Sequence, residues 1–485
     1  MTLLDPDLWT GRIFLGGWVR GGGTDIRVTA PATGEVLGSV GGATPSDVGR
    51  AGTAAAAAQR DWATTNPEVR AAVLRRAGEL WEAHAEEVQG WLVREAGSVS
   101  AKAGLETHVA AQECFEAAAL PTHPHGHVLP SAEAHWSFSR RRPAGVVSVI
   151  APFNFPLVLS IRSVAPALAL GNAVLLKPDP RTPVCGGVAL VRIFEEAGLP
   201  AGLLHLLPGG VDVGQALISA PEVRVVSFTG STAAGRAVGE LGSRHLKRTH
   251  LELGGNNALV VLPGADVALA ASAGAFGSFL HQGQICMSTG RHLVHESLHD
   301  AYVAALAEKA DHLPVGDPAS GQVALGPIID TAQLQHIDRL VRETVLAGAR
   351  LAAGGSFEGL FYRPTVLADV TPTMAAYTEE VFGPVAPVVA FGSITEVIAL
   401  ASDTDYGLSL GILGDVGLAM QVADAIPSGI VHINEQTVAD EANIPFGGVG
   451  GSGTGSRFGG AEANIEAFTE TQWLTVRSQI APYPF

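Results

Sequence analysis

From about residue 144, short runs of aliphatic and β-branched residues alternate with alanine-rich stretches that are long enough to form helices. Neighbouring parallel strands need a long crossover of this kind, whereas antiparallel strands can be joined by a tight turn. The alternation therefore predicts an α/β fold with a parallel, doubly wound sheet, whose ligands bind at the carboxyl ends of the strands. The expected strands are 146–150, 173–176, 203–207 and 223–228, with helices at 183–197 and 232–241.

Other parts of the chain predict further units. Residues 51–120 carry apolar positions at helical spacing, so we expect a helical segment there. A second α/β run begins near residue 256 and continues to about 450, with strands at 258–262 and 292–295 and a long helix at 331–346. Residues 137–142 and 467–478 fit neither unit, and we expect two strands that form an arm toward another subunit.

Composition excludes several classes of protein. The formal net charge of −17 argues against nucleic acid or an anionic membrane surface as the main partner. The most apolar stretch, 157–176, is broken by Arg162, Pro166 and Gly171, so it predicts a helix, a turn and a strand rather than a membrane span. The first nine residues lack the features of a secretory signal.

The three cysteines, at positions 114, 185 and 286, cannot all pair with one another, and none has C-x-x-C spacing. This pattern favours a reducing cytoplasm and gives no indication of a metal site.

Two segments supply a candidate nucleophile and a candidate base. Cys286 ends the sequence His-Gln-Gly-Gln-Ile-Cys, and Glu252 lies 34 positions earlier within Leu-Glu-Leu-Gly-Gly. A thiolate is a strong nucleophile near neutral pH, and a carboxylate can activate water to hydrolyse an acyl group held on sulfur. A lone cysteine and a lone glutamate are more often structural, so the pair needs support from other motifs.

A glycine-containing turn, 227–235, follows one predicted strand and opens a predicted helix. Gly230 permits close approach of the backbone, and free N–H groups at a helix start favour anionic oxygens such as phosphate. By itself, a turn of this kind is more often a plain helix cap.

Six motifs together resemble the NAD(P)-dependent aldehyde dehydrogenase superfamily, in its order and at near-family spacing, from about residue 12 to 478. They are Ala151–Pro156, Phe228–Gly235, Leu251–Gly255, Gly283–Cys286, Glu380–Pro384 and Pro445–Gly448. The resemblance implies a Rossmann-type cofactor-binding domain (1–124 and 144–254, with 452–465). It also implies a second α/β catalytic domain (255–451) and a small β oligomerisation arm (125–143 and 466–485).

The same resemblance implies roles for individual residues. Cys286 matches the family nucleophile, Glu252 the general base, and Asn154 the amide that holds the oxyanion together with the Cys286 N–H. For NAD or NADP, Lys177 matches the adenosine ribose contact, Gly210, Gly230 and Ser231 surround the diphosphate, and Glu380 and Phe382 meet the nicotinamide end.

Three departures from the family pattern bear on these roles. Pro180 stands where many members have a glutamate that binds the adenosine 2'-hydroxyl, so a 2'-phosphate is not repelled and Arg181 could attract it. NADP and NAD both stay open. Arg457 stands where many relatives place an acid, so that acid's proton-relay role cannot be transferred. Phe153 replaces a frequent tryptophan.

The sequence in and around these motifs is similar to that of the benzaldehyde and vanillin dehydrogenase branch, which implies an aromatic aldehyde as substrate. Phe155, Ile285, Met287 and Phe446 would line the approach to Cys286 with apolar surface that offers no cation to a carboxylated substrate. The alternatives are an aliphatic or semialdehyde dehydrogenase, a CoA-acylating enzyme, or a non-catalytic relative that only binds cofactor. Esterase activity is expected only as a side reaction. A homodimer and a homotetramer stay open.

Overall fold

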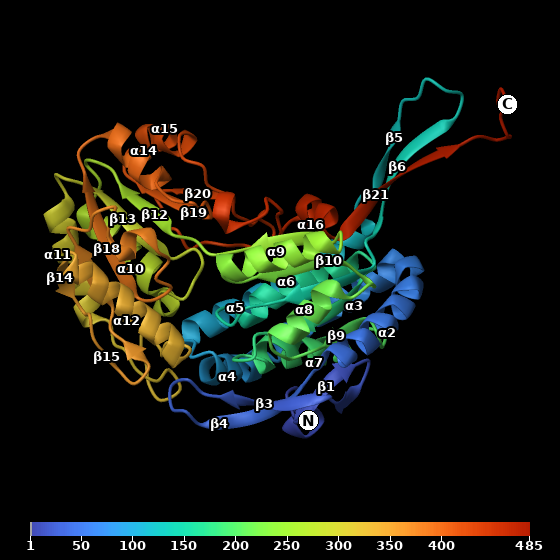
Figure 1. Cartoon of the computed structure of the whole chain (residues 1–485), viewed down its shortest axis with the longest axis horizontal. Helices are drawn as coiled ribbons and strands as arrows, with labels where there is room; N and C mark the ends of the chain where they lie inside the picture. Colours follow the sequence, from blue (N-terminus) through green and yellow to red (C-terminus); the bar gives the residue numbers. More distant parts are fainter. Residues whose placement is uncertain (1) are drawn as a thin grey trace.

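The computed structural model describes residues 2–485, which form two seven-stranded sheets and a thin arm (Figure 1). The first sheet has the order β11-β10-β7-β8-β9-β1-β2. Its strands are β1 (Arg12–Leu15), β2 (Trp18–Arg20), β7 (Val146–Ile150), β8 (Ala173–Lys177), β9 (Leu204–Leu206), β10 (Val223–Thr229) and β11 (Arg248–Glu252).

The five strands from β11 to β9 pair in parallel, as the alternating sequence pattern predicts. The other edge of the sheet adds an antiparallel pair, β1 and β2, that the sequence analysis did not foresee. Only Gly16 and Gly17 join these two strands, which is too short for a helical crossover, and Gly16 supplies a φ of +79° for the turn.

Helices cover both faces of the first sheet. They are α2 (Pro45–Thr64), α3 (Pro67–Ala83), α4 (Ala85–Glu95), α5 (Ser100–Ala119), α6 (Pro156–Ala169), α7 (Ala189–Glu196), α8 (Val211–Ser219), α9 (Thr232–Arg244) and α16 (Ala461–Phe468). A π-helical turn (Val184–Val188) precedes α7, so the stretch predicted as one helix at 183–197 has two parts. The N-terminus of α2 is fixed by a capping box between Thr44 and Asp47.

The second sheet has the order β14-β17-β18-β13-β12-β19-β20. Its strands are β12 (Asn257–Val261), β13 (Thr289–His295), β14 (Arg350–Ala353), β17 (Thr365–Ala368), β18 (Val385–Phe391), β19 (Ser409–Leu413) and β20 (Ile430–Ile433). Its helices are α10 (Val267–Phe279), α11 (His299–His312), α12 (Thr331–Leu346), α13 (Ala375–Thr378), α14 (Ile394–Ser402) and α15 (Val416–Asp424). All pairs are parallel except β14 with β17.

Shorter elements connect or extend these layers. They are α1 (Pro6–Trp9), the hairpins β3 (Gly23–Thr29) with β4 (Val36–Gly42) and β15 (Phe357–Glu358) with β16 (Phe361–Tyr362), and the 3₁₀ turns Leu120–Thr122, Leu280–Gly283 and Gly450–Ser452.

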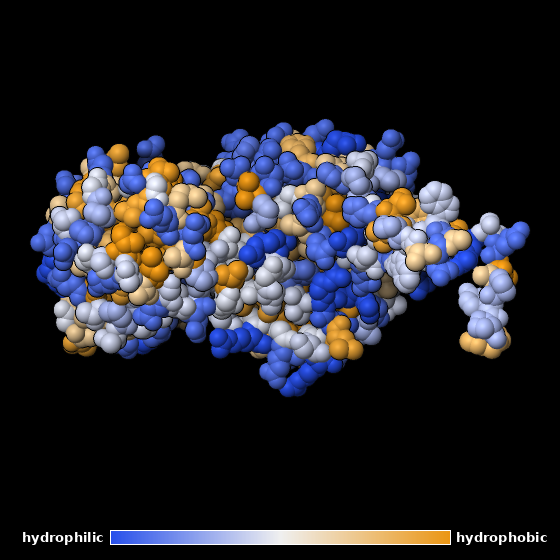
Figure 2. All heavy atoms as spheres, turned by 90° about the horizontal axis from the view of Figure 1, so that it is seen from above, coloured by the Kyte–Doolittle hydropathy of each residue, from blue (hydrophilic) through white to orange (hydrophobic). Residues whose placement is uncertain are grey.

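The arm is a three-stranded antiparallel sheet of order β21-β6-β5, which projects from one end of the body (Figures 1 and 2). Its strands are β5 (Gly126–Leu129), β6 (Trp136–Pro143) and β21 (Thr469–Val476). The strand predicted from residue 467 begins two residues later, because Ala467 and Phe468 end α16.

The central strands of the first sheet are buried along their whole length, including β7, β8 and β9. Only the residues at the carboxyl ends of these strands and in the loops beyond them can therefore meet a ligand. No helix among residues 2–485 is both long and apolar enough to cross a membrane. The domain boundaries given above stay a prediction.

Candidate active site

Cys286 lies in the loop that joins the 3₁₀ turn Leu280–Gly283 to β13. The side-chain amide of Asn257 donates to the carbonyl oxygens of Cys286 and Ser288, both at 2.8 Å. On the other side of the cysteine, the carbonyl oxygen of Gln284 accepts from Asn154 Nδ2 at 2.9 Å. The main chain is therefore fixed on both sides of the sulfur.

The turn before this loop has a rare backbone conformation. His281, Gln282 and Gly283 have φ values of +49°, +57° and +66°. Positive φ is strained for residues other than glycine, at about 1–3 kcal/mol each, and needs support from the surroundings. That support includes the Gln282 side chain, whose Nε2 donates to the carbonyl oxygens of Gly97 at 3.2 Å and Pro327 at 2.8 Å.

Asn154 precedes α6, and a buried ion pair fixes its main chain. Lys102 Nζ donates to the carbonyl oxygen of Asn154 at 2.8 Å and pairs with Glu106, one turn along α5. Glu106 Oε1 in turn accepts from the N–H groups of Leu157 at 3.0 Å and Val158 at 3.3 Å, at the start of α6. An amide has two N–H donors, so the bond to Gln284 leaves Asn154 one donor for a ligand.

Glu252 is the last residue of β11, and its side chain is buried. Within the described chain, neither carboxylate oxygen has a well-formed hydrogen bond, although the N–H of Gly448 lies near enough to lower the pKa of the carboxyl. Burial raises the pKa of Glu252 to about 8, and the positive charges of Arg457 and Arg162 act in the opposite direction. With this pKa the carboxyl is mostly protonated at pH 7, and it becomes an effective proton acceptor near and above pH 8.

Burial also raises the pKa of the Cys286 thiol to about 12, and the negative charges of Glu380 and Glu252 add to this rise. The thiol is therefore protonated at neutral pH in the ligand-free chain. Sequence reasoning invoked a thiolate, so the structure adds a requirement: a base must take the proton when sulfur attacks.

A cavity of about 110 Å³ opens at the sulfur and is called the Cys286 cavity below. Its lining includes Cys286, Asn154, the four residues expected to form an apolar approach (Phe155, Ile285, Met287 and Phe446), and three charged residues, Glu106, Arg162 and Asp440. The expectation that this approach would offer no cation is wrong. The sequence marks Arg162 only as a break in an apolar stretch, because its place at the cavity beside Asp440 depends on the folded chain.

A second cavity, of about 530 Å³, is called the Lys177 cleft. It lies at the carboxyl ends of β7, β8 and β10, between α8 and α9, where Lys177 and Gly210 line it. Gly230 and Ser231 are not among its lining residues, but they form the turn that starts α9. The Ser231 hydroxyl caps that helix by accepting from Ala234 N at 3.4 Å.

Glu380 and Phe382 lie outside the Lys177 cleft, on the loop before β18. Glu380 Oε1 accepts from the N–H of Gly255 at 2.8 Å, and burial raises the pKa of this carboxyl to about 7. The Phe382 ring meets the Phe153 ring edge to face, with centroids 6.0 Å apart. The loop therefore faces the Leu251–Gly255 segment that carries Glu252.

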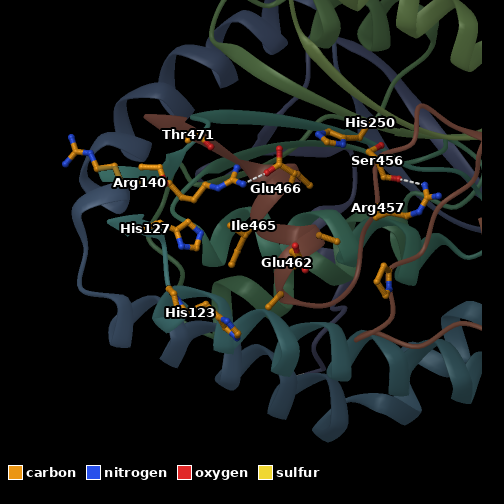
Figure 3. A pocket seen from close by; sticks show the side chains of 18 of the residues that line it. His123, His127, Arg140, His250, Ser456, Arg457, Glu462, Ile465, Glu466 and Thr471 are labelled. Carbon is orange, nitrogen blue, oxygen red and sulfur yellow. Dashed lines mark hydrogen bonds and ion pairs between the residues drawn. The ribbon is translucent and has the colours of Figure 1, made fainter. Parts of the chain in front are cut away.

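A larger cavity, of about 810 Å³, lies at the foot of the arm (Figure 3). Its wall carries His123, His127, Arg140 and Arg457, and Glu466 forms an ion pair with Arg141 there. None of the predicted site residues lines it, so size alone does not identify the site of chemistry.

Comparison with known proteins places this geometry in a family. Residues 18–474 match the aldehyde dehydrogenase family. The chain belongs to that family. It is 65% identical to a vanillin dehydrogenase of an Amycolatopsis strain, and the match covers 100% of both chains. It is 46% identical to a benzaldehyde dehydrogenase [NAD(+)] of Pseudomonas putida, with 99% of each chain covered.

Among solved structures, a salicylaldehyde dehydrogenase from Pseudomonas putida G7 complexed with salicylaldehyde superimposes with a TM-score of 0.94. That chain is 36% identical, and the match covers 98% of this chain and 99% of the other. The predicted family, the α/β fold class and the assignment as a nicotinamide-dependent aldehyde dehydrogenase are therefore confirmed. The roles of individual residues stay predictions.

The Lys177 cleft of this aldehyde dehydrogenase fits a dinucleotide. The starts of α8 and α9 border it, Gly209 and Gly210 add no side chains to its wall, and Lys177 supplies a buried cation. Such helix starts favour phosphate oxygens because their N–H groups lack partners within the helix.

Arg181 does not serve the cleft as the sequence suggested. Its guanidinium donates to Asp179 and Asp330, with distances of 2.8 Å, and stacks over the Phe153 ring at 4.1 Å. Arg181 is not among the residues that line the cleft. Two carboxylates already neutralise this cation, so it is a poor candidate for binding a 2'-phosphate.

Proposed function

We propose that this enzyme oxidises an aromatic aldehyde to the carboxylic acid at Cys286. The observation that carries the proposal is the Cys286 cavity, where the sulfur and Asn154 share one small space with the rings of Phe155 and Phe446. Flat apolar walls suit an aromatic ring. The similarity to enzymes named for vanillin, benzaldehyde and salicylaldehyde supports the same substrate class.

The chemistry begins with addition of Cys286 Sγ to the carbonyl carbon. A carbon–sulfur bond forms, the thiol proton passes to Glu252, and negative charge develops on the substrate oxygen. Asn154 Nδ2 and the Cys286 N–H are proposed to donate to that oxygen. Preset donors of this kind are worth about 2.7–4 kcal/mol each in a water-poor site.

The adduct then loses hydride from the former aldehyde carbon, which leaves a thioester on Cys286. A bound nicotinamide supplies the hydride acceptor. Lys177, Gly210, Gly230 and Ser231 are proposed to hold the adenosine and diphosphate part of NAD or NADP. Glu380 and Phe382 are proposed to hold the nicotinamide end.

Hydrolysis completes the reaction. Glu252 first releases the thiol proton to solvent. It then takes a proton from water as the water oxygen attacks the thioester carbon. The carbon–sulfur bond breaks to release the acid, and the Cys286 sulfur regains a proton from Glu252. A carboxylate that can activate water favours water as the acyl acceptor over an external thiol such as CoA.

We also propose that the arm binds a second copy of this chain. Residues that face each other across the strands share one face of the arm sheet, and the register gathers apolar side chains on one such face. They are Val128, Trp136, Phe138, Leu474 and Val476. Trp136 is 65% exposed and Val128 is 64% exposed, and exposed apolar patches mark interfaces. A homodimer and a homotetramer both fit.

The cytoplasm is proposed as the location of the enzyme. Cys114, Cys185 and Cys286 are all free thiols, and free thiols persist best in a reducing compartment.

The experiment that tests the proposed activity is an initial-rate survey with NAD and with NADP. The substrates are benzaldehyde, its hydroxyl and methoxyl derivatives, and a short aliphatic aldehyde. We expect the highest kcat/KM with an aromatic aldehyde and no acceleration by added CoA. An aliphatic preference would overturn the substrate class, and acyl-CoA formation would overturn hydrolysis. No turnover with any pair would favour a non-catalytic relative.

A further inference from the structure

Three charged side chains form a cluster beside the Cys286 cavity. Arg162, on α6, forms a close ion pair through Nη2 with Asp440 Oδ2, and the same nitrogen lies 3.5 Å from Glu113 Oε1. Its guanidinium stacks over the Phe446 ring at 4.6 Å. Arg162 and Asp440 line the cavity, whereas Glu113 does not. The cluster therefore presents an arginine and a carboxylate to whatever enters.

The cluster is incompletely hydrogen-bonded, although Arg162 is only 4% exposed. Within residues 2–485, neither Arg162 Nε nor Arg162 Nη1 has an acceptor, and Asp440 Oδ1 has no donor. Buried polar groups in folded proteins are nearly always paired, so each exception needs an explanation. A structural tie between α6 and the 440 region would need only the Arg162–Asp440 pair, which leaves these three atoms unexplained.

The unpaired atoms also specify the chemistry of a ligand. Arg162 offers donors only, and Asp440, which is paired with it, offers an acceptor at Oδ1. A hydroxyl group both accepts and donates, so it satisfies the two residues together. A methoxyl oxygen only accepts, and a carboxylate would meet the negative charges of Asp440 and Glu113. A ring that carries no polar group would leave all three atoms unpaired.

We infer that Arg162 and Asp440 bind a hydroxyl group on the substrate ring, which makes this enzyme selective for phenolic aldehydes. The inference rests on the proposed oxidation of aromatic aldehydes, since it assigns the polar end of the same cavity. Arg162 donates a hydrogen bond to the hydroxyl oxygen, and Asp440 accepts a hydrogen bond from the hydroxyl group. The ring lies among the apolar side chains that also line the Cys286 cavity.

The test compares kcat/KM for 2-, 3- and 4-hydroxybenzaldehyde with kcat/KM for benzaldehyde. We expect at least one hydroxyl isomer to exceed benzaldehyde by about tenfold or more in the unmodified enzyme, as hydrogen bonds to charged groups do. Arg162→Met should bring that ratio to near one, and Asp440→Asn should lower it by a smaller factor. Benzaldehyde is the internal control, because misfolding or an altered Cys286 would slow both substrates.

Glu113→Gln is the matched control variant. It touches Arg162 without lining the cavity, so the hydroxyl ratio should stay as in the unmodified enzyme. Asp440→Asn keeps the shape of the side chain, so it serves if Arg162→Met does not fold. A ratio near one in the unmodified enzyme, or a ratio unchanged in both cavity variants, would overturn the inference.

A binding measurement separates this inference from the proposed activity. Calorimetry with 4-hydroxybenzamide and with benzamide, and likewise the 2- and 3-hydroxy isomers, needs no turnover. Tighter binding of a hydroxylated amide that Arg162→Met abolishes would support the hydroxyl site even if no aldehyde were oxidised. Equal binding of all four amides would overturn the site while leaving the oxidation assay to decide the activity.

Discussion

The loop that carries Cys286 and the strand end that carries Glu252 are built in opposite ways. Hydrogen bonds from Asn257 and Asn154 hold the main chain on both sides of the sulfur. The carboxylate of Glu252, by contrast, is buried without a well-formed hydrogen bond within the described chain. The structure thus fixes the position of the nucleophile, whereas burial and nearby charges set the pKa of the base.

This difference matches what each group is proposed to do. Sulfur must approach one carbon atom from one direction, and rigid placement lowers the barrier for such an attack. Glu252 must collect protons from two sources, first the thiol and later water. A carboxylate without well-formed hydrogen bonds can serve both, and its pKa of about 8 lets it accept and release a proton near pH 8.

Removal of the sulfur should have the largest effect. We expect Cys286→Ala to lower the steady-state rate of aldehyde oxidation by roughly 10⁶-fold, the scale seen when an enzymatic nucleophile is deleted. Reduced cofactor is followed at 340 nm. Cys114→Ala, which changes a buried thiol that does not line the cavity, is the control and should retain activity. Comparable turnover by the Cys286 variant would show that sulfur is not the nucleophile.

Removal of the base should slow both halves of the reaction, because Glu252 is proposed to take the thiol proton as well as the water proton, and hydrolysis should stall after any acyl group has formed. Glu252→Gln should lower steady-state turnover by about 10²–10⁴-fold, while still allowing at most one equivalent of reduced cofactor per site. Rapid mixing and mass spectrometry of the quenched protein would detect the acyl group on Cys286. Steady turnover at the original rate would assign water activation to another group.

Removal of an oxyanion donor should have a smaller effect. Asn154→Ala should raise the barrier by about 2.7–4 kcal/mol, or roughly 10²–10³-fold in kcat. The same change also removes the bond to Gln284, so thermal melting of the variant should be compared with that of Asn154→Asp, which keeps the side-chain size. An unchanged kcat in Asn154→Ala would exclude the amide from the oxyanion site.

The smallest expected effect is a shift of the pH profile when the charge of Arg457 is removed. Activity should rise with pH through about 8, as Glu252 loses its proton, and fall away below that pH. The positive charge of Arg457 lowers the pKa of Glu252, so Arg457→Met should move the rising limb of the kcat/KM profile to higher pH. The plateau at high pH should change little. A limb that stays in place would show that Arg457 does not act on the base.

Much of this architecture could be predicted from local sequence. The strands β7, β8 and β10 and the helix α12 fall where the alternation of residue types places them, because each is a single run of suitable residues. The pair β1 and β2 was missed, since three- and four-residue strands carry too little pattern to identify them. Strand β1 joins the sheet by pairing with β9, at least 190 residues away in the sequence.

The site residues divide in the same way, between those that local motifs predict and those that only the folded chain brings together. Cys286, Glu252 and Asn154 stand in recognisable motifs, whereas the ion pair of Lys102 with Glu106 lies in an alanine-rich helix and shows only a four-residue spacing. The Arg162–Asp440 pair joins residues 278 positions apart. No local pattern in a single sequence marks such a contact, because only the folded chain brings the two charges together.

The arm is completed only when strands that are far apart in the sequence have both been synthesised. Its middle strand, β6, is made early, but one edge stays open until β21 arrives; Trp473 donates to a serine 336 positions before it. An open edge can pair wrongly with other chains. Since β21 closes this edge, a partner that bound the three-stranded arm would select chains in which β21 is already paired. The strand made last of the three would therefore decide when the arm can be recognised.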